Sequence, residues 1–161
     1  APFGLTLRQV IDEYGDGMRA GSKFHFALTG GAAGTIVSEK YMDIPIDYAS
    51  GAKGISLGAG AFLICDQGVS PVAFLCNLLN FFRHESCGKC TPCRVGTHRA
   101  HEILENLTQN KGNPGDVEEL RSLADVMYDS SFCGLGQSVP IPMRSALDNF
   151  NDEFTAAERR I

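Results

Sequence analysis

The feature that most constrains this chain is the grouping of its cysteines. Three of the six fall within seven residues, and the full set is Cys65, Cys76, Cys87, Cys90, Cys93 and Cys133. Cysteines two residues apart bridge poorly, so this spacing is typical of metal binding rather than of a disulfide framework. The segment from Cys87 to Cys93 has the order C-x2-C-x2-C. Three thiolates at this spacing can each reach a different iron of one cubic cluster.

The fourth ligand has one downstream candidate. The bacterial ferredoxin pattern places a fourth cysteine after three more residues, where this chain has Thr97, and Cys133 is the only cysteine that follows Cys93. We therefore predict one [4Fe-4S] cluster whose ligands are Cys87, Cys90, Cys93 and Cys133. A structural zinc ion on the same four thiolates is the alternative, although zinc sites usually combine two well-separated C-x2-C pairs.

The residues around these cysteines favour an anionic cofactor. Thr91-Pro92 has the pattern of a helix N-cap followed by proline, so we expect Cys93 in the first helical turn, near the positive helix end. Lys89 and Arg94 add positive charge, and His84 precedes the first ligand by three residues. These three are candidates to surround the cluster, and the alternative for them is solvated surface.

Other polar and sulfur groups give weaker signals. Cys65 and Cys76 lie in apolar runs and are predicted to be core thiols. His98 and His101 are one helical turn apart and can bind a metal, but on a polar face we expect them to be solvated or at an interface. The segment 30–34 is rich in glycine without the G-x-G-x-x-G order, so it predicts a turn rather than a phosphate-binding loop.

Composition bounds the class of protein. The 161 residues fit one ordinary domain or two small ones, and the net charge of −5 without a basic stripe argues against nucleic acid as a partner. The longest uncharged stretch, 67–82, is too short to span a bilayer, so we expect no insertion into a membrane. Cysteines without a secretion signal predict a cytoplasmic location. The start at Ala1 without Met predicts either an engineered fragment or a piece of a longer chain.

The hydrophobic period changes near Gly68, which predicts two domains, 1–68 and 69–161. In the first, Thr6 and Gln9 have the spacing of a capping box that opens a short helix ending near Tyr14. Alternation predicts strands over 23–29 and 60–65, separated by the glycine turn and irregular chain. One helix beside a few strands indicates a small α+β domain.

The sequence pattern predicts that the second domain is helical throughout. Ser70-Pro71 begins a helix with an apolar stripe as far as Phe82, and a period of about 3.6 predicts further helices over 92–107, 116–128 and 142–154. Four helices with short loops indicate a small bundle. The expected fold class is therefore α+β, with a small sheet domain followed by an all-α four-helix bundle that holds the cluster.

At this point the residues resemble a known family. Glu85 to Arg94 resembles the ESCGxCxPCR signature of the flavin- and NADH-binding subunit of respiratory complex I and of the diaphorase subunits of NAD(P)-linked hydrogenases and formate dehydrogenases. Cys133 lies 40 positions after Cys93, close to the spacing of that family. The run from Cys133 to Gln137, followed by Pro140 and Pro142, is more similar to the hydrogenase and formate dehydrogenase branch. Residues 6–67 are similar to the family's small β-grasp (ubiquitin-like) domain of the soluble-ligand-binding type.

The resemblance implies a place in an electron-transfer chain. The family's complete subunit is a flavoprotein that exchanges electrons between NAD(P)H and FMN and passes single electrons to this cluster. FMN and NAD(P) bind an upstream domain whose glycine-rich and acidic motifs are absent from this sequence. The implied partners are that flavin domain, a thioredoxin-like [2Fe-2S] subunit and an iron–sulfur catalytic subunit. We expect this chain alone to relay electrons in an NAD(P)-linked oxidoreductase without reducing NAD, and we predict no catalytic residue in it.

Two alternatives to electron transfer belong to other classes of function. One is a structural module, stapled by zinc or by a cluster, that only docks subunits. The other is a ligand-binding β-grasp domain fused to a cluster domain.

Overall fold

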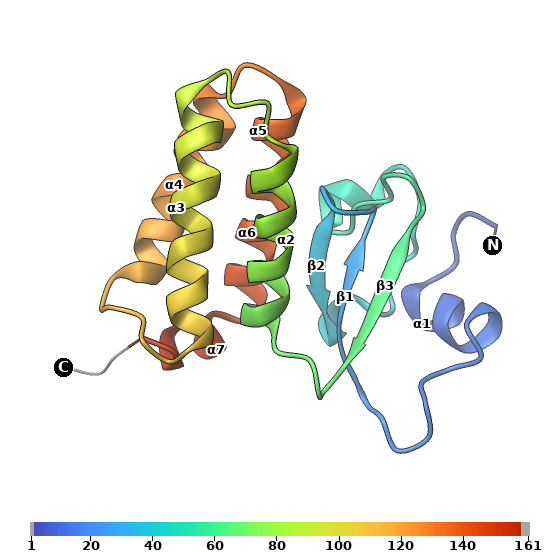
Figure 1. Ribbon diagram of the computed structural model, residues 1–161. Helices are drawn as coiled ribbons and strands as arrows, with labels where there is room; N and C mark the ends of the chain where they lie inside the picture. The colour runs from blue at the N-terminus through green and yellow to red at the C-terminus, as the bar shows by residue number, and fades with distance from the viewer. Residues whose placement is uncertain (1, 159–161) are drawn as a thin grey trace. The chain divides into compact units, whose positions relative to one another are not determined.

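The computed structural model describes residues 2–158. Its residues form two compact units that divide between Val69 and Ser70 (Figure 1). The first contains a small sheet and the second is helical, as the predicted α+β class requires. None of the helices described combines the length and apolarity needed to cross a membrane.

The first unit opens with the capped helix that the sequence predicts. Thr6 Oγ1 accepts from the Gln9 amide at 3.2 Å, and the Thr6 amide donates to Gln9 Oε1 at 3.0 Å, which completes the capping box. The helix is not uniform, because one α-helical turn, α1 (Leu7–Gln9), passes into a π-helical turn, η1 (Val10–Tyr14). Leu7 and Ile11 are the buried residues of these two turns.

A three-stranded antiparallel sheet forms the rest of the first core. Its strands are β1 (Phe24–Thr29), β2 (Thr35–Ser38) and β3 (Phe62–Asp66), in the order β2-β1-β3. Ala27 in the central strand pairs with Val37 on one side and Ile64 on the other. The prediction of a half-buried strand over 23–29 differs from the structure, since every residue from Phe26 to Thr29 is buried. A central strand covered on both faces does not alternate in burial.

Strand β2 lies in the segment that the sequence pattern predicts to be irregular. It has four residues and follows the predicted glycine turn. Two short 3-10 turns, Glu39–Tyr41 and Ser50–Lys53, follow β2. Their neighbours Met42, Ile46 and Ile55 join the core of this unit. The sequence pattern misses the strand because its pairing with β1, rather than its own short pattern, defines it.

The second unit is a bundle of six helical segments. They are α2 (Pro71–Glu85), α3 (Thr91–Thr108), α4 (Asp116–Ser130), α5 (Gly134–Ser138), α6 (Pro140–Asn149) and α7 (Asn151–Ala156). The first three match the predicted helices closely, and Ser70 caps α2 as expected, with its hydroxyl accepting from the Ala73 amide. The predicted helix over 142–154 instead begins at Pro140 and divides at Phe150, whose φ of −133° and ψ of 29° lie outside the helical region.

Ion pairs fix α4 against its neighbours in the bundle. Arg99 of α3 binds both carboxylate oxygens of Glu119, at 2.6 and 2.9 Å. On the other side of α4, Asp125 accepts from Arg144 of α6 at 2.7 Å. Between them run fully buried apolar side chains such as Leu104, Leu120 and Met127. This packing positions the loop that follows α4, which carries Cys133.

Candidate metal centre

The first cysteine loop connects α2 to α3. Gly88 in this loop has a φ of +72°, and its amide donates to Ser86 Oγ at 3.3 Å. Cys93 lies in the first turn of α3, as the sequence predicts, but the N-cap is Cys90 rather than the predicted Thr91, which is already the first helical residue. Arg94 closes the loop, because its guanidinium donates to the Gly88 carbonyl. The loop is therefore held from both of its ends.

The second cysteine loop connects α4 to α5. The Ser131 amide donates to the Met127 carbonyl at 3.2 Å, and the Ser131 carbonyl accepts from Gln137 Nε2 at 2.9 Å. Cys133 is the N-cap of α5. Figure 1 shows this loop and the α2–α3 loop at the same end of the bundle.

The two loops touch each other through the cysteines. The Phe132 amide hydrogen-bonds to the Cys90 thiol, and this bond is the main reason why the pKa of Cys90 is lowered. Burial is the main reason why the pKa of Cys93 is raised, and charge on the thiols of Cys90, Cys133 and Cys87 raises it further. The structure thus brings the other three predicted cysteines within electrostatic range of Cys93.

Gly136 of α5, which has no side chain, lies very close to atoms of both cysteine loops. A Cβ on Gly136 of α5 would lie 2.5 Å from Ser131 Oγ, 2.6 Å from Ser131 Cβ and 3.0 Å from Cys93 Cβ. Contacts this short leave no room for a methyl group, so glycine at this position lets α5 pack against the first turn of α3.

The donor set fits a [4Fe-4S] cluster. Such clusters bind four cysteine thiolates, each on a different iron, and here two thiols are buried, Cys90 and Cys93, and two are exposed, Cys87 and Cys133. Among residues 2–158, no three His, Cys, Asp or Glu side chains converge on the position of a single ion. Four thiolates that bind four separate irons do not need to converge in that way. The Ser131 hydroxyl, buried beside the same loops, has no hydrogen-bond partner in the described chain.

Of the three residues predicted to surround the cluster, only Arg94 has a side-chain hydrogen bond to the first cysteine loop from outside it. Arg94 contacts the first cysteine loop, as described. Lys89 within that loop is exposed. His84 is also exposed, and its Nδ1 donates to the Asn80 carbonyl of its own helix at 2.7 Å.

The remaining two thiols, together with His98 and His101, belong to other segments than the two cysteine loops. Cys65 is buried in the first unit and Cys76 is half-buried in α2, and burial raises the pKa of both thiols. His98 is exposed, but His101 is buried, contrary to the expectation of a solvated or interface residue. Its Nδ1 lies 3.4 Å from Arg83 Nη1, and burial is the main reason why the pKa of His101 is lowered.

Sequence reasoning missed three residues of the centre. They are Ser86, whose Oγ lies 3.3 Å from Cys93 Sγ, and Gly136, which packs against both Cys93 and the third residue, Ser131. The only available signal was proximity, since Ser86 precedes one cysteine directly and Ser131 lies two residues before another.

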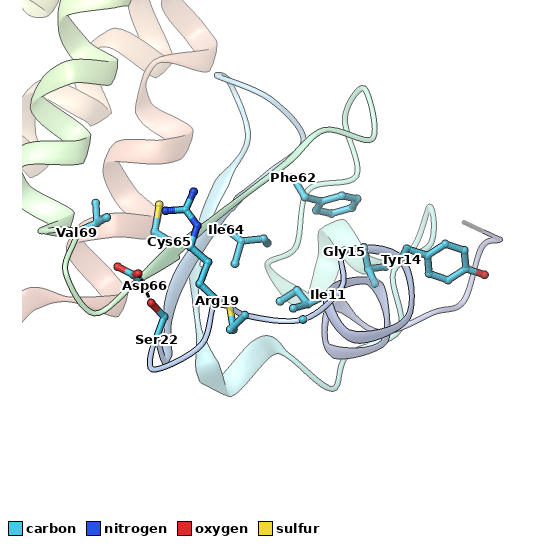
Figure 2. A pocket seen from close by; sticks show the side chains of 13 residues that line it. Ile11, Tyr14, Gly15, Arg19, Ser22, Phe62, Ile64, Cys65, Asp66 and Val69 are labelled. Carbon is cyan, nitrogen blue, oxygen red and sulfur yellow. Dashed lines mark hydrogen bonds between the residues drawn. The ribbon is translucent and has the colours of Figure 1, made fainter.

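A separate cavity lies within the first unit. It has a volume of about 530 Å³ and is lined mainly by apolar side chains of η1 and β3, including Ile11, Phe62 and Ile64 (Figure 2). Asp66 at its edge accepts from Ser22 Oγ at 2.7 Å and from the Gly68 amide at 3.0 Å, and these bonds lower its pKa. The Arg19 side chain is among those that line the cavity (Figure 2).

Known proteins similar in sequence match this chain over nearly its whole length, through both units. The chain is 40% identical over 156 residues to NADP-reducing hydrogenase subunit HndC of Solidesulfovibrio fructosivorans, covering 96% of this chain and 32% of that protein. It is 38% identical over 157 residues to the F subunit of NADH-quinone oxidoreductase from Mycobacterium tuberculosis (strain ATCC 25618 / H37Rv), covering 97% and 35%. It therefore spans about a third of the length of these curated relatives.

A solved structure and a family pattern agree with these relatives. The crystal structure of an NAD+-reducing [NiFe]-hydrogenase in the H2-reduced state matches 100% of this chain and 27% of its own chain, with a TM-score of 0.85 at 26% identity. Residues 73–157 match the family described as the NADH-ubiquinone oxidoreductase-F iron-sulfur binding region, which takes a [4Fe-4S] cluster. This match spans both cysteine loops and more than half of the chain, and the chain therefore belongs to that family.

Proposed function

We propose that this chain is an electron-transfer module in which Cys87, Cys90, Cys93 and Cys133 hold one [4Fe-4S] cluster. The proposal is supported by two observations: the two loops that carry these cysteines lie at the same end of the bundle, and Cys93 lies within electrostatic range of the other three thiols. A bound [4Fe-4S] cluster supplies one-electron redox chemistry. Family membership supports electron transfer in an NAD(P)-linked oxidoreductase.

In this proposal, the buried and the exposed cysteines of the two loops bind different sides of the cluster. Buried Cys90 and Cys93 hold the inner side of the centre and exclude water from it, whereas exposed Cys87 and Cys133 hold its outer side. The Phe132 amide stabilises the Cys90 thiolate by a hydrogen bond. Arg94, by holding the Gly88 carbonyl, orients the first loop. The outer side is where a redox partner can approach.

Anaerobic EPR spectroscopy after dithionite reduction tests the proposal. The chain should be brown and should give the signal of a reduced cluster that returns on repeated oxidation and reduction. Cys133→Ser should abolish or distort the signal, whereas Cys76→Ser, which removes a half-buried thiol from α2 outside the centre, should leave it unchanged. An unchanged signal in Cys133→Ser would show that the fourth ligand is wrong.

The rival function, a docking module without a redox role, predicts a different outcome. A structural zinc ion gives a colourless protein, and a purely structural cluster does not reduce reversibly. Either result would replace electron transfer by subunit docking as the function of the bundle.

The wider setting extends the same proposal. In the complete protein, the electron donor is FMN reduced by NAD(P)H on another domain, and the acceptors are clusters of partner subunits, among them a thioredoxin-like [2Fe-2S] subunit and an iron–sulfur catalytic subunit. The parent complex is a cytoplasmic hydrogenase, formate dehydrogenase or NADH dehydrogenase. The names of the relatives, a hydrogenase subunit and an NADH-quinone oxidoreductase subunit, support this setting. The purified chain should neither bind flavin nor oxidise NADH, and turnover of NADH would refute this division of labour.

A second candidate function, ligand binding by the first unit, is favoured by its cavity. A volume of about 530 Å³ is within the range of small-molecule sites. Arg19 lines this largely apolar space and its charge helps to lower the pKa of Asp66 at the same cavity, without a direct hydrogen bond or ion pair of the guanidinium among the described residues. An aromatic or aliphatic anion is the ligand that Arg19 and the apolar lining would favour. Binding of 8-anilinonaphthalene-1-sulfonate, followed by fluorescence, should weaken in Arg19→Gln but not in Arg8→Gln, a matched change outside the cavity. Equal affinities would rule out this site.

A further inference from the structure

The Ser131 hydroxyl is the observation that the proposed function leaves unexplained. Ser131 is 4% exposed, and its Oγ is the one buried side-chain oxygen or nitrogen of the described chain that has no hydrogen-bond partner. Buried polar groups in native proteins are almost always paired, because an unpaired hydroxyl loses its bonds to water without a replacement. A buried hydroxyl with no protein partner therefore indicates a partner that is not part of the protein chain.

The surroundings of this hydroxyl limit what that partner can be. Both backbone groups of Ser131 are already bonded, to the Met127 carbonyl and to Gln137 Nε2. Ser131 Oγ and Cys93 Cβ lie 2.5 and 3.0 Å from the same point, the Cβ position of Gly136. The next residue, Phe132, donates its amide to the Cys90 thiol. Ser131 thus packs against the same glycine as Cys93 and directly precedes the residue that bonds to Cys90.

We propose that the Ser131 hydroxyl donates a hydrogen bond to a sulfur atom of the bound [4Fe-4S] cluster and so raises its reduction potential. This inference rests on the proposed ligand set. Sulfur atoms of a cluster carry negative charge that grows when one electron is added, so a donor to sulfur stabilises the reduced state more than the oxidised state. Ser86 provides a parallel on the other loop, since its Oγ lies 3.3 Å from Cys93 Sγ.

An EPR-monitored redox titration of the full 161-residue chain tests the inference. Ser131→Ala removes the hydroxyl and adds no volume. Its midpoint potential should become more negative by about 59 mV, which corresponds to a tenfold change in the one-electron equilibrium, the effect expected for one hydrogen bond. Ser130→Ala, at the exposed end of α4, is the matched control and should keep the wild-type potential.

The outcomes separate this inference from the function on which it rests. A wild-type cluster that titrates, with Ser131→Ala at the same potential, overturns the role of Ser131 and leaves electron transfer standing. A wild-type chain without a redox-active cluster overturns both. If Ser131→Ala loses its cluster, Ser131→Thr, which keeps a hydroxyl, is titrated instead. A near-wild-type potential in that variant supports the hydrogen bond, and loss of the cluster from both variants overturns it.

Discussion

Gly136 offers the sharpest test of how the two cysteine loops are held together. In Gly136→Ala, the new methyl carbon would sit 2.5 Å from Ser131 Oγ and 3.0 Å from Cys93 Cβ. The Ser131 hydroxyl can rotate away, but Ser131 Cβ at 2.6 Å and Cys93 Cβ at 3.0 Å are fixed to the backbone. The backbone of α5, of the α4–α5 loop or of α3 must therefore move. Inserting a methyl group into a well-packed site costs about 1–3 kcal/mol.

A second glycine of the same helix provides the control against which the destabilisation by Gly136→Ala is measured. Gly134 also lies in α5, and a Cβ there meets no atom within 4 Å. Gly134→Ala should therefore be neutral or stabilise by about 0.5–1 kcal/mol, because alanine restricts the unfolded chain. The two alanine variants should differ in the free energy of unfolding by about 2 kcal/mol, or about 30-fold in the folding equilibrium.

The assay measures folding and cluster content together. Urea unfolding followed by circular dichroism gives the free energy for each variant, and iron analysis with visible absorption gives cluster content. We expect Gly136→Ala to lose both stability and iron, because displacement of α5 moves Cys133 away from Cys93. If Gly136→Ala unfolds at the same urea concentration and holds as much iron as Gly134→Ala, the close packing of α5 on α3 is wrong.

Two further predictions concern the charge and the cofactor of the bundle. The Arg99–Glu119 pair, whose side chains are 37% and 41% exposed, should contribute less than about 1 kcal/mol. Because its bonds to Arg99 lower the folded-state pKa of Glu119 below 4.5, this stability is present above pH 4.5 and lost as pH falls through the folded pKa. Unfolding free energies of wild type and Glu119→Gln should therefore differ near neutral pH and converge in acid, with exposed Glu118→Gln as the control; a constant difference would contradict the ion pair. Removal of iron by oxidation and chelation should lower the melting temperature of the bundle, because metal binding contributes to folding, and an unchanged melting curve would show that the cluster does not join the two loops.

The sequence alone predicted what depends on neighbours in the chain. The capping box of Thr6 and Gln9 and the cap of α2 at Ser70 follow from hydrogen bonds between residues three apart, so local patterns reveal them. The spacing of Cys87, Cys90 and Cys93 is likewise local, and it indicates an iron–sulfur centre without reference to the fold. The family pattern agrees with that cofactor.

Only the tertiary structure decided what depends on distant segments. Strand β2 exists because β1 pairs with it, and His101 is buried because α2 covers its face of α3, which a helical period on a polar face does not reveal. The packing of α4 against α3 and α6 carries Cys133 to three thiols 40 or more positions earlier. The roles of Gly136 and Ser131 can be recognised only in the tertiary structure. The close packing at Gly136 and the unpaired Ser131 hydroxyl both depend on atoms that approach across the bundle rather than along the chain.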